Sequence, residues 1–302
     1  MVMFVDENGV RDALQWPDLI AAMREALADL SGGRVQQPVR NMLTIEEGRR
    51  YLGVMPAVTR QVMGLKMVSF YPANEGTSVP THMAMIMLFR TDSGEPLAVI
   101  DGRLITEMRT AAVSAAVTDR LASPDSRVLA LLGSGVQARA HLEALMTVRD
   151  FDEVRVWSRT RSHAERFAAE HGAHAMDAET AVQGADVVVT ATSATEPVLQ
   201  GKWLKPGAHV NAVGAPRPNW RELDDEAMSE IVVVDSRDAV LKESGDVILS
   251  NATIHAEAGE IFSGAKAVPQ GRTTVFKSVG LAIEDLAAAR LVVETLQRKQ
   301  RS

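Results

Sequence analysis

The residues with the clearest chemical meaning form a glycine-rich turn, Leu132-Gly133-Ser134-Gly135-Val136-Gln137-Ala138. The turn follows an apolar strand predicted over residues 127–132 and opens a helix predicted to end at Val148. In a G-x-G-x-x-A pattern the first glycine makes a tight turn, the second lets a pyrophosphate approach the backbone, and the small third residue allows close helix–strand packing. The helix N-terminus also favours an anion. We therefore predict a dinucleotide site in which the contacts are Gly133, Ser134, Gly135, Val136 and Gln137.

The residues after the next predicted strand, 153–157, indicate which dinucleotide is bound. An NAD site usually has Asp or Glu there for the ribose hydroxyls. This chain reads Trp157-Ser158-Arg159-Thr160, without a carboxylate, and an arginine can pair with a 2′-phosphate. We predict NADPH as the cofactor, with NADH as the alternative, and contacts from Ser158, Arg159 and Thr160. The other interpretation is that Arg159 is a solvated residue at a helix start.

His82 is a candidate proton donor because imidazole titrates in the useful pH range. It follows Pro80-Thr81 at the start of an apolar strand, and Thr81 is its neighbouring polar contact. The alternative is a histidine that is hydrogen-bonded at a strand start and has no chemical role.

Metal and thiol chemistry have no support in the sequence. There are no cysteines, which excludes disulfides, thiolate nucleophiles and cysteine-ligated metals. His163, His171 and His174 lie on or just beyond one polar helix without an H-E-x-x-H pattern, so we predict no metal site.

The overall composition is that of a globular protein with a substantial core. The 302 residues are 46% hydrophobic and 24% charged, and the net charge is -7. An acidic chain is a poor partner for nucleic acid or an anionic membrane, because both need a basic surface. The N-terminus lacks the apolar region of a signal peptide, and the longest apolar runs are too short to span a bilayer. We therefore expect a cytoplasmic protein.

Two different patterns of secondary structure divide the chain. Before residue 102, a helix over 17–30 precedes strand-like segments that indicate an antiparallel sheet, at 40–55, 62–71, 83–89 and 96–101. Met83, Met85 and Met87 recur with period two, which we interpret as core or the wall of a cleft. After residue 126, strands alternate with helices, which indicates a parallel sheet with helices on both faces; further strands are predicted at 186–190, 209–213 and 231–235. The predicted fold class is α/β, a doubly wound parallel sheet joined to an α+β domain.

Several longer motifs carry a family resemblance that runs nearly end to end. They are Gln37-Pro38-Val39-Arg40, Tyr51-Leu52-Gly53-Val54-Met55-Pro56, Ile105-Thr106-Glu107-Met108-Arg109-Thr110-Ala111-Ala112, Gly207-Ala208-His209-Val210-Asn211-Ala212-Val213-Gly214, Trp220-Arg221-Glu222-Leu223-Asp224-Asp225, Lys242-Glu243-Ser244-Gly245-Asp246, Phe276-Lys277-Ser278 and Glu284-Asp285. With these residues the chain resembles the ornithine cyclodeaminase/mu-crystallin family, most closely its ketimine reductase branch.

The resemblance implies a Rossmann domain at 116–280 and a substrate-binding and dimerisation domain made of 1–115 and 281–302, to which the C-terminal helix returns. It also implies a homodimer and an active site in the cleft between the domains. A basic set there, Arg40, Lys66 and Arg109, would hold the substrate carboxylate. The alternative for these cations is a structural salt bridge with one of the chain's many acids.

The resemblance also assigns further residues to the cofactor and to proton transfer. Arg109 and Thr110 match positions that contact the cofactor phosphates. Val213 and Gly214 match further cofactor-binding positions, and Ser278, with Lys277, matches positions that touch the nicotinamide end. Glu257 matches a glutamate that would orient the ring or relay a proton, with a plain loop acid as the alternative.

One departure separates this chain from the cyclodeaminases. These enzymes carry an aspartate soon after the pair that matches Val213-Gly214, and here the matching residue is Pro216. Proline cannot accept or donate a proton, which argues against cyclodeaminase activity.

The resemblance therefore implies reduction of a C=N bond beside a carboxylate, in a cyclic ketimine or a 2-imino acid. Two alternatives stay open: an amino-acid dehydrogenase of the alanine type, and a non-catalytic binding protein for NADPH and a small ligand.

Overall fold

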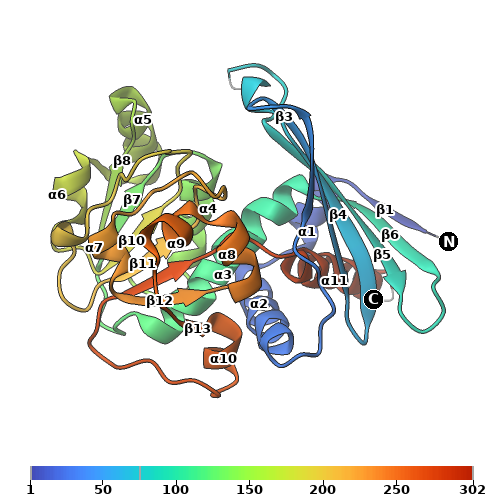
Figure 1. The fold of residues 1–302 in the computed structure, drawn as a ribbon. Helices are drawn as coiled ribbons and strands as arrows, with labels where there is room; N and C mark the ends of the chain where they lie inside the picture. Colours follow the sequence, from blue (N-terminus) through green and yellow to red (C-terminus); the bar gives the residue numbers. More distant parts are fainter. Residues whose placement is uncertain (1, 75, 301–302) are drawn as a thin grey trace. The chain divides into compact units, whose positions relative to one another are not determined.

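The computed structural model describes residues 2–74 and 76–300 (Figure 1). The chain divides into two compact units, Met1–Arg109 with Leu281–Ser302, and Thr110–Gly280. We call them unit 1 and unit 2. Their boundary lies inside helix α3 (Arg103–Leu121), six residues before the boundary that we predicted at 115/116.

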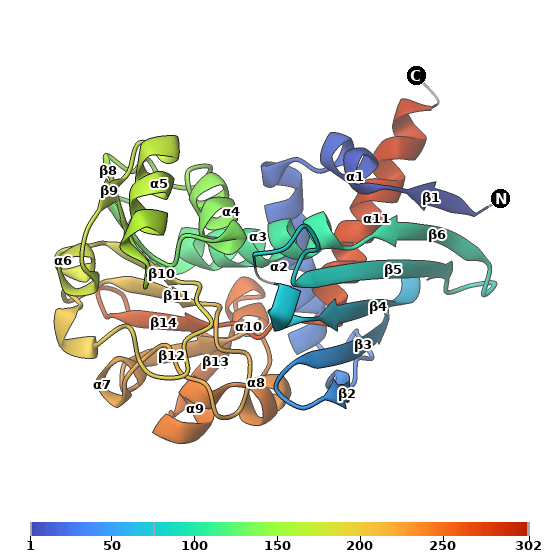
Figure 2. The ribbon, with the colours of Figure 1, turned by 90° about the horizontal axis from the view of Figure 1, so that it is seen from above.

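Unit 1 is built on a six-stranded sheet in the order β1-β6-β5-β4-β3-β2, which Figure 2 shows strand by strand. Its strands are β1 (Met3–Val5), β2 (Asn41–Glu46), β3 (Arg50–Val58), β4 (Val62–Phe70), β5 (His82–Arg90) and β6 (Pro96–Asp101). The predicted antiparallel sheet is confirmed for β2 to β6. We did not predict β1, which pairs with β6 in parallel.

The helices of unit 1 cover one face of this sheet. They are α1 (Glu7–Ala13), α2 (Trp16–Ser31) and α11 (Ala282–Lys299), and a short 3-10 helix lies at Pro72–Asn74. Helix α11 packs against α2 and against β3, β4 and β5. Because side chains alternate across a strand, the register row that contains Met55, Lys66, Ile86 and Ile100 faces this core, and all four are buried.

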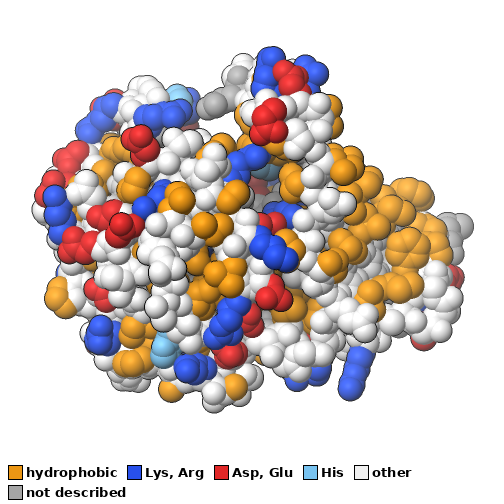
Figure 3. Space-filling view, viewed as in Figure 1, with side chains coloured by type: hydrophobic (Ala, Val, Ile, Leu, Met, Phe, Trp, Pro, Cys, Tyr) orange, Lys and Arg blue, Asp and Glu red, His pale blue; other side chains and the backbone are white. Residues whose placement is uncertain are grey.

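The opposite face of the same sheet is apolar and exposed. Met67 and Met85 are neighbours in the register and are 42% and 44% exposed, and Phe4 on β1 is 79% exposed. Figure 3 shows hydrophobic side chains gathered over this sheet. Our interpretation of the methionines as core was therefore wrong for Met83 and Met85, which this chain leaves exposed.

Unit 2 is an eight-stranded sheet in which every pairing is parallel, in the order β13-β12-β14-β11-β10-β7-β8-β9. The strands are β7 (Val128–Leu132), β8 (Glu153–Trp157), β9 (His174–Ala175), β10 (Val187–Thr190), β11 (His209–Ala212), β12 (Ile231–Val234), β13 (Ile254–Glu257) and β14 (Thr274–Lys277). The doubly wound Rossmann fold is confirmed, although the sequence patterns gave no strand at β9, β13 or β14.

The connections of unit 2 are mostly short helices. They are α4 (Val136–Leu145), α5 (Arg161–His171), α6 (Ala178–Val182), α7 (Asp225–Met228), α8 (Arg237–Glu243), α9 (Gly245–Ser250) and α10 (Ala258–Phe262), with a 3-10 helix at Gly201–Trp203. From β7 the chain runs outward through β8 and β9 and then returns to β10 on the other side of β7. Ligands of open parallel sheets bind at the carboxyl ends of the strands, where the strand order reverses in this way.

Candidate active site

The glycine turn between β7 and α4 has the geometry that a pyrophosphate needs. Gly133 has φ of +125°, and a Cβ there would lie 2.5 Å from the carbonyl oxygen of Ala191, so only glycine fits. A Cβ on Gly135 would meet no atom within 4 Å. Gly135 is the N-cap residue of α4 and provides no side-chain cap. The start of α4 therefore offers open space and helical N–H groups to an anion, which fits a dinucleotide.

Three further loops leave the same edge of the sheet. Ser158, Arg159 and Thr160 follow β8, and the side chains of Arg159 and Thr160 are exposed. Val213 and Gly214 follow β11, and Ser278 follows β14. Because the strands are parallel, their carboxyl ends lie along one edge. These predicted cofactor residues of unit 2 thus follow its strands at that edge. Thr110 is an exception, because it lies half-buried on helix α3.

A buried charged cluster behind this edge fixes the peptide of Gly214. The carboxylate of Glu222 accepts hydrogen bonds from the Gly214 N–H at 2.8 Å and the Thr192 N–H at 2.6 Å. Lys277 Nζ donates to the Gly214 carbonyl at 2.5 Å and pairs with Asp246 at 2.8 Å. Burial raises the pKa of Glu222, and the charge of Lys277 opposes that rise.

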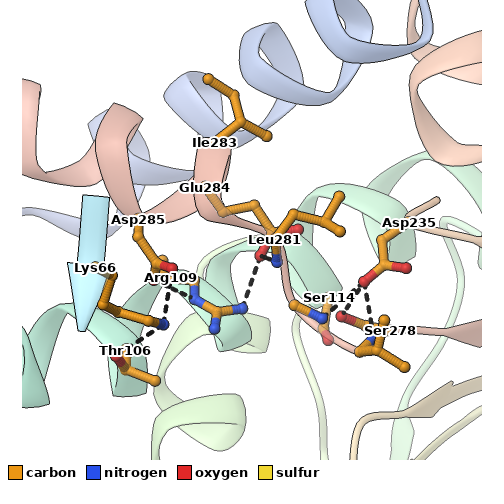
Figure 4. A network of polar contacts seen from close by, with 12 residues as sticks. Lys66, Thr106, Arg109, Ser114, Asp235, Ser278, Leu281, Ile283, Glu284 and Asp285 are labelled. Atoms are coloured by element: carbon orange, nitrogen blue, oxygen red, sulfur yellow. Dashed lines mark hydrogen bonds and ion pairs between the residues drawn. The ribbon is translucent and has the colours of Figure 1, made fainter. Parts of the chain in front are cut away.

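Two residues that the resemblance places near the nicotinamide make buried contacts within unit 2. Lys277 is 0% exposed and contacts Gly214 and Asp246, and its contact with the nicotinamide stays a prediction. Ser278 is 3% exposed and donates its hydroxyl to Asp235 at 3.0 Å (Figure 4). Asp235 also accepts the backbone N–H groups of Val279 and Gly280, at 2.7 and 2.8 Å. The Ser278 hydroxyl therefore anchors its own loop.

Unit 1 brings two of the predicted cations, Lys66 and Arg109, against two buried acids from the first turn of α11 (Figure 4). Lys66 Nζ lies 2.7 Å from an oxygen of Asp285. Arg109 donates from Nε to the other oxygen of Asp285 at 3.0 Å and from Nη1 to Glu284 at 2.7 Å. Lys66 is 2% exposed, Arg109 is 5% exposed, and both acids are 0% exposed. Lys66 and Arg109 thus form the salt bridges that the alternative interpretation predicts, and the binding of a substrate carboxylate stays a prediction.

Burial lowers the pKa of Lys66 to about 8. The Asp285 carboxylate acts in the opposite direction and favours the ammonium, whereas Arg109 and Arg40 add like charge and lower the pKa further. Arg40, half-buried just before β2, is therefore close enough for its charge to act on Lys66. A lysine in this state carries its proton at neutral pH and can release it, as a general acid must.

The other two candidate proton donors lie in different surroundings. His82 is exposed at the start of β5, where it hydrogen-bonds Thr81 at 3.2 Å and contacts the ring of Phe70. His82 lies four residues before Ile86, the residue that pairs with Lys66 in the sheet. Four residues span about 13 Å along a strand. Glu257 ends β13 in unit 2, accepts the Arg237 N–H at 2.9 Å and takes part in the capping box of α10.

Glu284 and Asp285 belong to one of the family motifs, but the sequence predicted no role for either acid. Two acids at the start of a helix are usually explained by the helix dipole, so their type and position indicate a solvated first turn. Their burial against Lys66 and Arg109 became visible only in the fold.

The described residues show neither a metal centre nor a membrane span. Within 2–74 and 76–300, no group of three or more metal-ligating side chains could hold an ion. In the same ranges, no helix combines the length and apolar character needed to cross a bilayer.

The fold and the glycine turn define a Rossmann-type dinucleotide-binding protein with a second, α+β unit. Residues 2–300 match the ornithine cyclodeaminase/mu-crystallin family, and the chain belongs to that family. It is 50% identical to the ketimine reductase mu-crystallin of Mus musculus, over 97% of this chain and 96% of the mouse protein.

Two solved structures share the fold over nearly the whole chain. The Δ1-pyrroline-2-carboxylate reductase of Thermococcus litoralis, solved with NADH and L-proline, is 33% identical with a TM-score of 0.93, and the match covers 99% of this chain and 98% of that one. An archaeal alanine dehydrogenase dimer with bound NAD is 31% identical with a TM-score of 0.92, covering 99% and 97%.

Proposed function

We propose that this protein is an NAD(P)H-dependent oxidoreductase that reduces a C=N bond beside a carboxylate, as a ketimine or imine reductase. The family, the half-identical ketimine reductase and the similar pyrroline-2-carboxylate reductase support this reaction. Unit 2 would hold the dinucleotide through the glycine turn, and unit 1 would hold the substrate. When bound, the reduced nicotinamide supplies a hydride for the carbon of the C=N bond.

The observation that carries the proposal is the gathering of cations around Lys66. Lys66 and Arg109 pair with the buried acids of α11, and the positive charges of Arg109 and Arg40 both act on Lys66. A substrate carboxylate would bind to these cations, since arginine binds carboxylates through its planar fork of donors.

Each residue of the set then has a distinct task. Arg40 and Arg109 orient the substrate carboxylate, and the two acids of α11 hold Arg109 in place. Lys66 gives a proton to the imine nitrogen, because an iminium accepts hydride far better than a neutral imine. His82 and Glu257 stay candidates for proton transfer, with Thr81 as a polar contact to the substrate.

A substrate panel at saturating NADPH tests the reaction. We expect NADPH oxidation with a cyclic ketimine carboxylate in the absence of ammonia. The similar alanine dehydrogenase supports a second candidate, which would instead need pyruvate together with ammonia. Tight NADPH binding without turnover on either substrate would point to a binding protein and contradict both reductase and dehydrogenase.

We propose NADPH over NADH because Arg159 is an exposed guanidinium at the end of β8. Replacing Arg159 by glutamine is expected to raise the KM for NADPH about tenfold, since a charge-assisted hydrogen bond is lost, and to leave the KM for NADH unchanged. Steady-state kinetics with both cofactors measures this. The control is Arg161→Gln, which removes an exposed arginine that pairs with Glu165. Equal effects on the two cofactors would refute the phosphate contact.

We also propose a homodimer that buries the exposed apolar face of the unit 1 sheet. Exposed apolar patches of this kind mark interaction sites, and the similar alanine dehydrogenase is described as a dimer. Light scattering is expected to give twice the chain mass of 32.6 kDa. Met85→Glu is expected to give monomers, because a carboxylate buried in an apolar interface has no partner. Leu241→Glu, on the exposed surface of α8, is the control. A monomeric wild type at micromolar concentration would contradict the dimer.

A further inference from the structure

Asp285 contacts two cations of the Lys66 cluster, Lys66 itself and Arg109. One of its oxygens lies 2.7 Å from Lys66 Nζ, and the other accepts Arg109 Nε at 3.0 Å (Figure 4). The neighbouring Glu284 also accepts a hydrogen bond from Arg109, at 2.7 Å, and one from the backbone N–H of Leu281. Asp285 is therefore the acid that links Arg109 directly to Lys66.

The position of Asp285 is fixed from several directions. It is fully buried in the first turn of an 18-residue helix that packs on β3, β4 and β5. The same turn is tied down by the Ile283 N–H, which donates to Gln37 at 2.7 Å. A carboxylate held in this way sets both the direction and the charge of the lysine that it contacts.

A buried ion pair such as Lys66–Asp285 is weak evidence for a stabilising role. A buried ion pair contributes little compared with apolar side chains of similar size, because desolvation offsets the attraction. Lys66 lies in a register row whose other members, Met55, Ile86 and Ile100, are apolar core residues. A functional reason for keeping the pair is therefore worth testing.

We infer that Asp285 is a positioning residue that keeps Lys66 protonated and aimed for proton transfer to the imine nitrogen. This inference rests on the proposed function and deepens it. In the step, an N–H bond of the Lys66 ammonium breaks and an N–H bond forms on the imine nitrogen. The lysine is left as a neutral amine, and it regains a proton from water after the product leaves. The electrons for the reduction come from the nicotinamide hydride.

The groups that act on the charge of Lys66 give the direction of the expected change. Asp285 on α11 favours the ammonium, whereas Arg109 on α3, Arg40 before β2 and burial favour the neutral amine; Thr106 on α3 adds a hydroxyl at 3.4 Å. Without the Asp285 charge, burial and the charges of Arg109 and Arg40 would all lower the pKa of Lys66. The amine then becomes neutral at a lower pH, which also avoids leaving an unpaired buried charge.

The test is the pH dependence of kcat/KM in Asp285→Asn. The protonated lysine is the active form, so wild-type activity is expected to fall as the pH rises through about 8. In Asp285→Asn this alkaline limb is expected to move down by about one to three pH units, the size of shift that a nearby opposite charge produces. Activity should then recover as the pH is lowered. A direct readout is the NMR titration of ¹³C-labelled lysine, with the Lys66 signal identified by its loss in Lys66→Met.

Glu284→Gln is the matched control, because it removes the adjacent acid that contacts Arg109. It is expected to raise the KM and leave the alkaline limb near its wild-type position. If Asp285→Asn does not fold, Asp285→Glu keeps the charge and displaces it, and should lower kcat more than it raises KM. An unmoved limb in a folded Asp285→Asn, or an Asp285→Glu that changes KM alone, would overturn the inference. Full activity of Lys66→Met would also overturn it, whereas a wild-type protein that oxidises no NADPH with cyclic ketimine carboxylates would refute the proposed function.

Discussion

Gly135→Val is expected to raise the Kd for NADPH by roughly 100-fold or more, which corresponds to about 2.7 kcal/mol of binding free energy. The backbone at Gly135 has φ of -87°, and a Cβ there meets no protein atom within 4 Å, so valine fits the folded protein. Its side chain would occupy the space through which the pyrophosphate approaches the start of α4. Fluorescence titration with NADPH measures the change, and circular dichroism confirms that the variant is folded.

Gly133→Ala is the matched comparison for this variant. Its Cβ would lie 2.5 Å from the Ala191 carbonyl, and its φ of +125° is strained for any L side chain, so the fold itself should lose stability. Gly135→Val should thus weaken NADPH binding in a folded protein, whereas Gly133→Ala should lower the stability of the fold. An unchanged NADPH affinity in a folded Gly135→Val protein would remove the basis for the cofactor site.

Lys66→Met is expected to lower kcat/KM by about 100-fold to 10,000-fold, the range that a positioned general acid contributes. The loss should appear at every pH, because methionine has no proton to give. The variant should also lose about 3 kcal/mol of unfolding free energy, since it breaks a buried ion pair and removes the cation at one oxygen of Asp285. Steady-state kinetics and urea unfolding measure the two effects separately.

The double variant Lys66→Met/Asp285→Asn separates chemistry from stability. Removing both charges should restore most of the unfolding free energy, because no unpaired ion stays buried. The activity should stay low, since the proton donor is still missing. Activity that returned together with stability would mean that Lys66 only supports the fold.

Local sequence patterns were sufficient to predict those features of the protein that depend on neighbouring residues. The G-x-G-x-x-A turn at Gly133 predicted its own strand, loop and helix, because each residue of that motif acts on its immediate neighbours. The strand at 153–157 was predicted with its observed bounds. The family motifs added the identity of the cations, although not what surrounds them.

Pairing between distant segments was decided only by the tertiary structure. Arg109 and Asp285 are 176 residues apart in sequence, and no periodicity links them. Two adjacent acids at a helix start have the same sequence signature whether they are solvated or buried under a sheet. Likewise, a period-two row of methionines shows that one face is apolar, but not which face the helices cover. Local propensity depends on near neighbours, whereas burial and charge pairing depend on the packing of the complete unit, and so Lys66 acquired its partner and its lowered pKa only when α11 packed against β4.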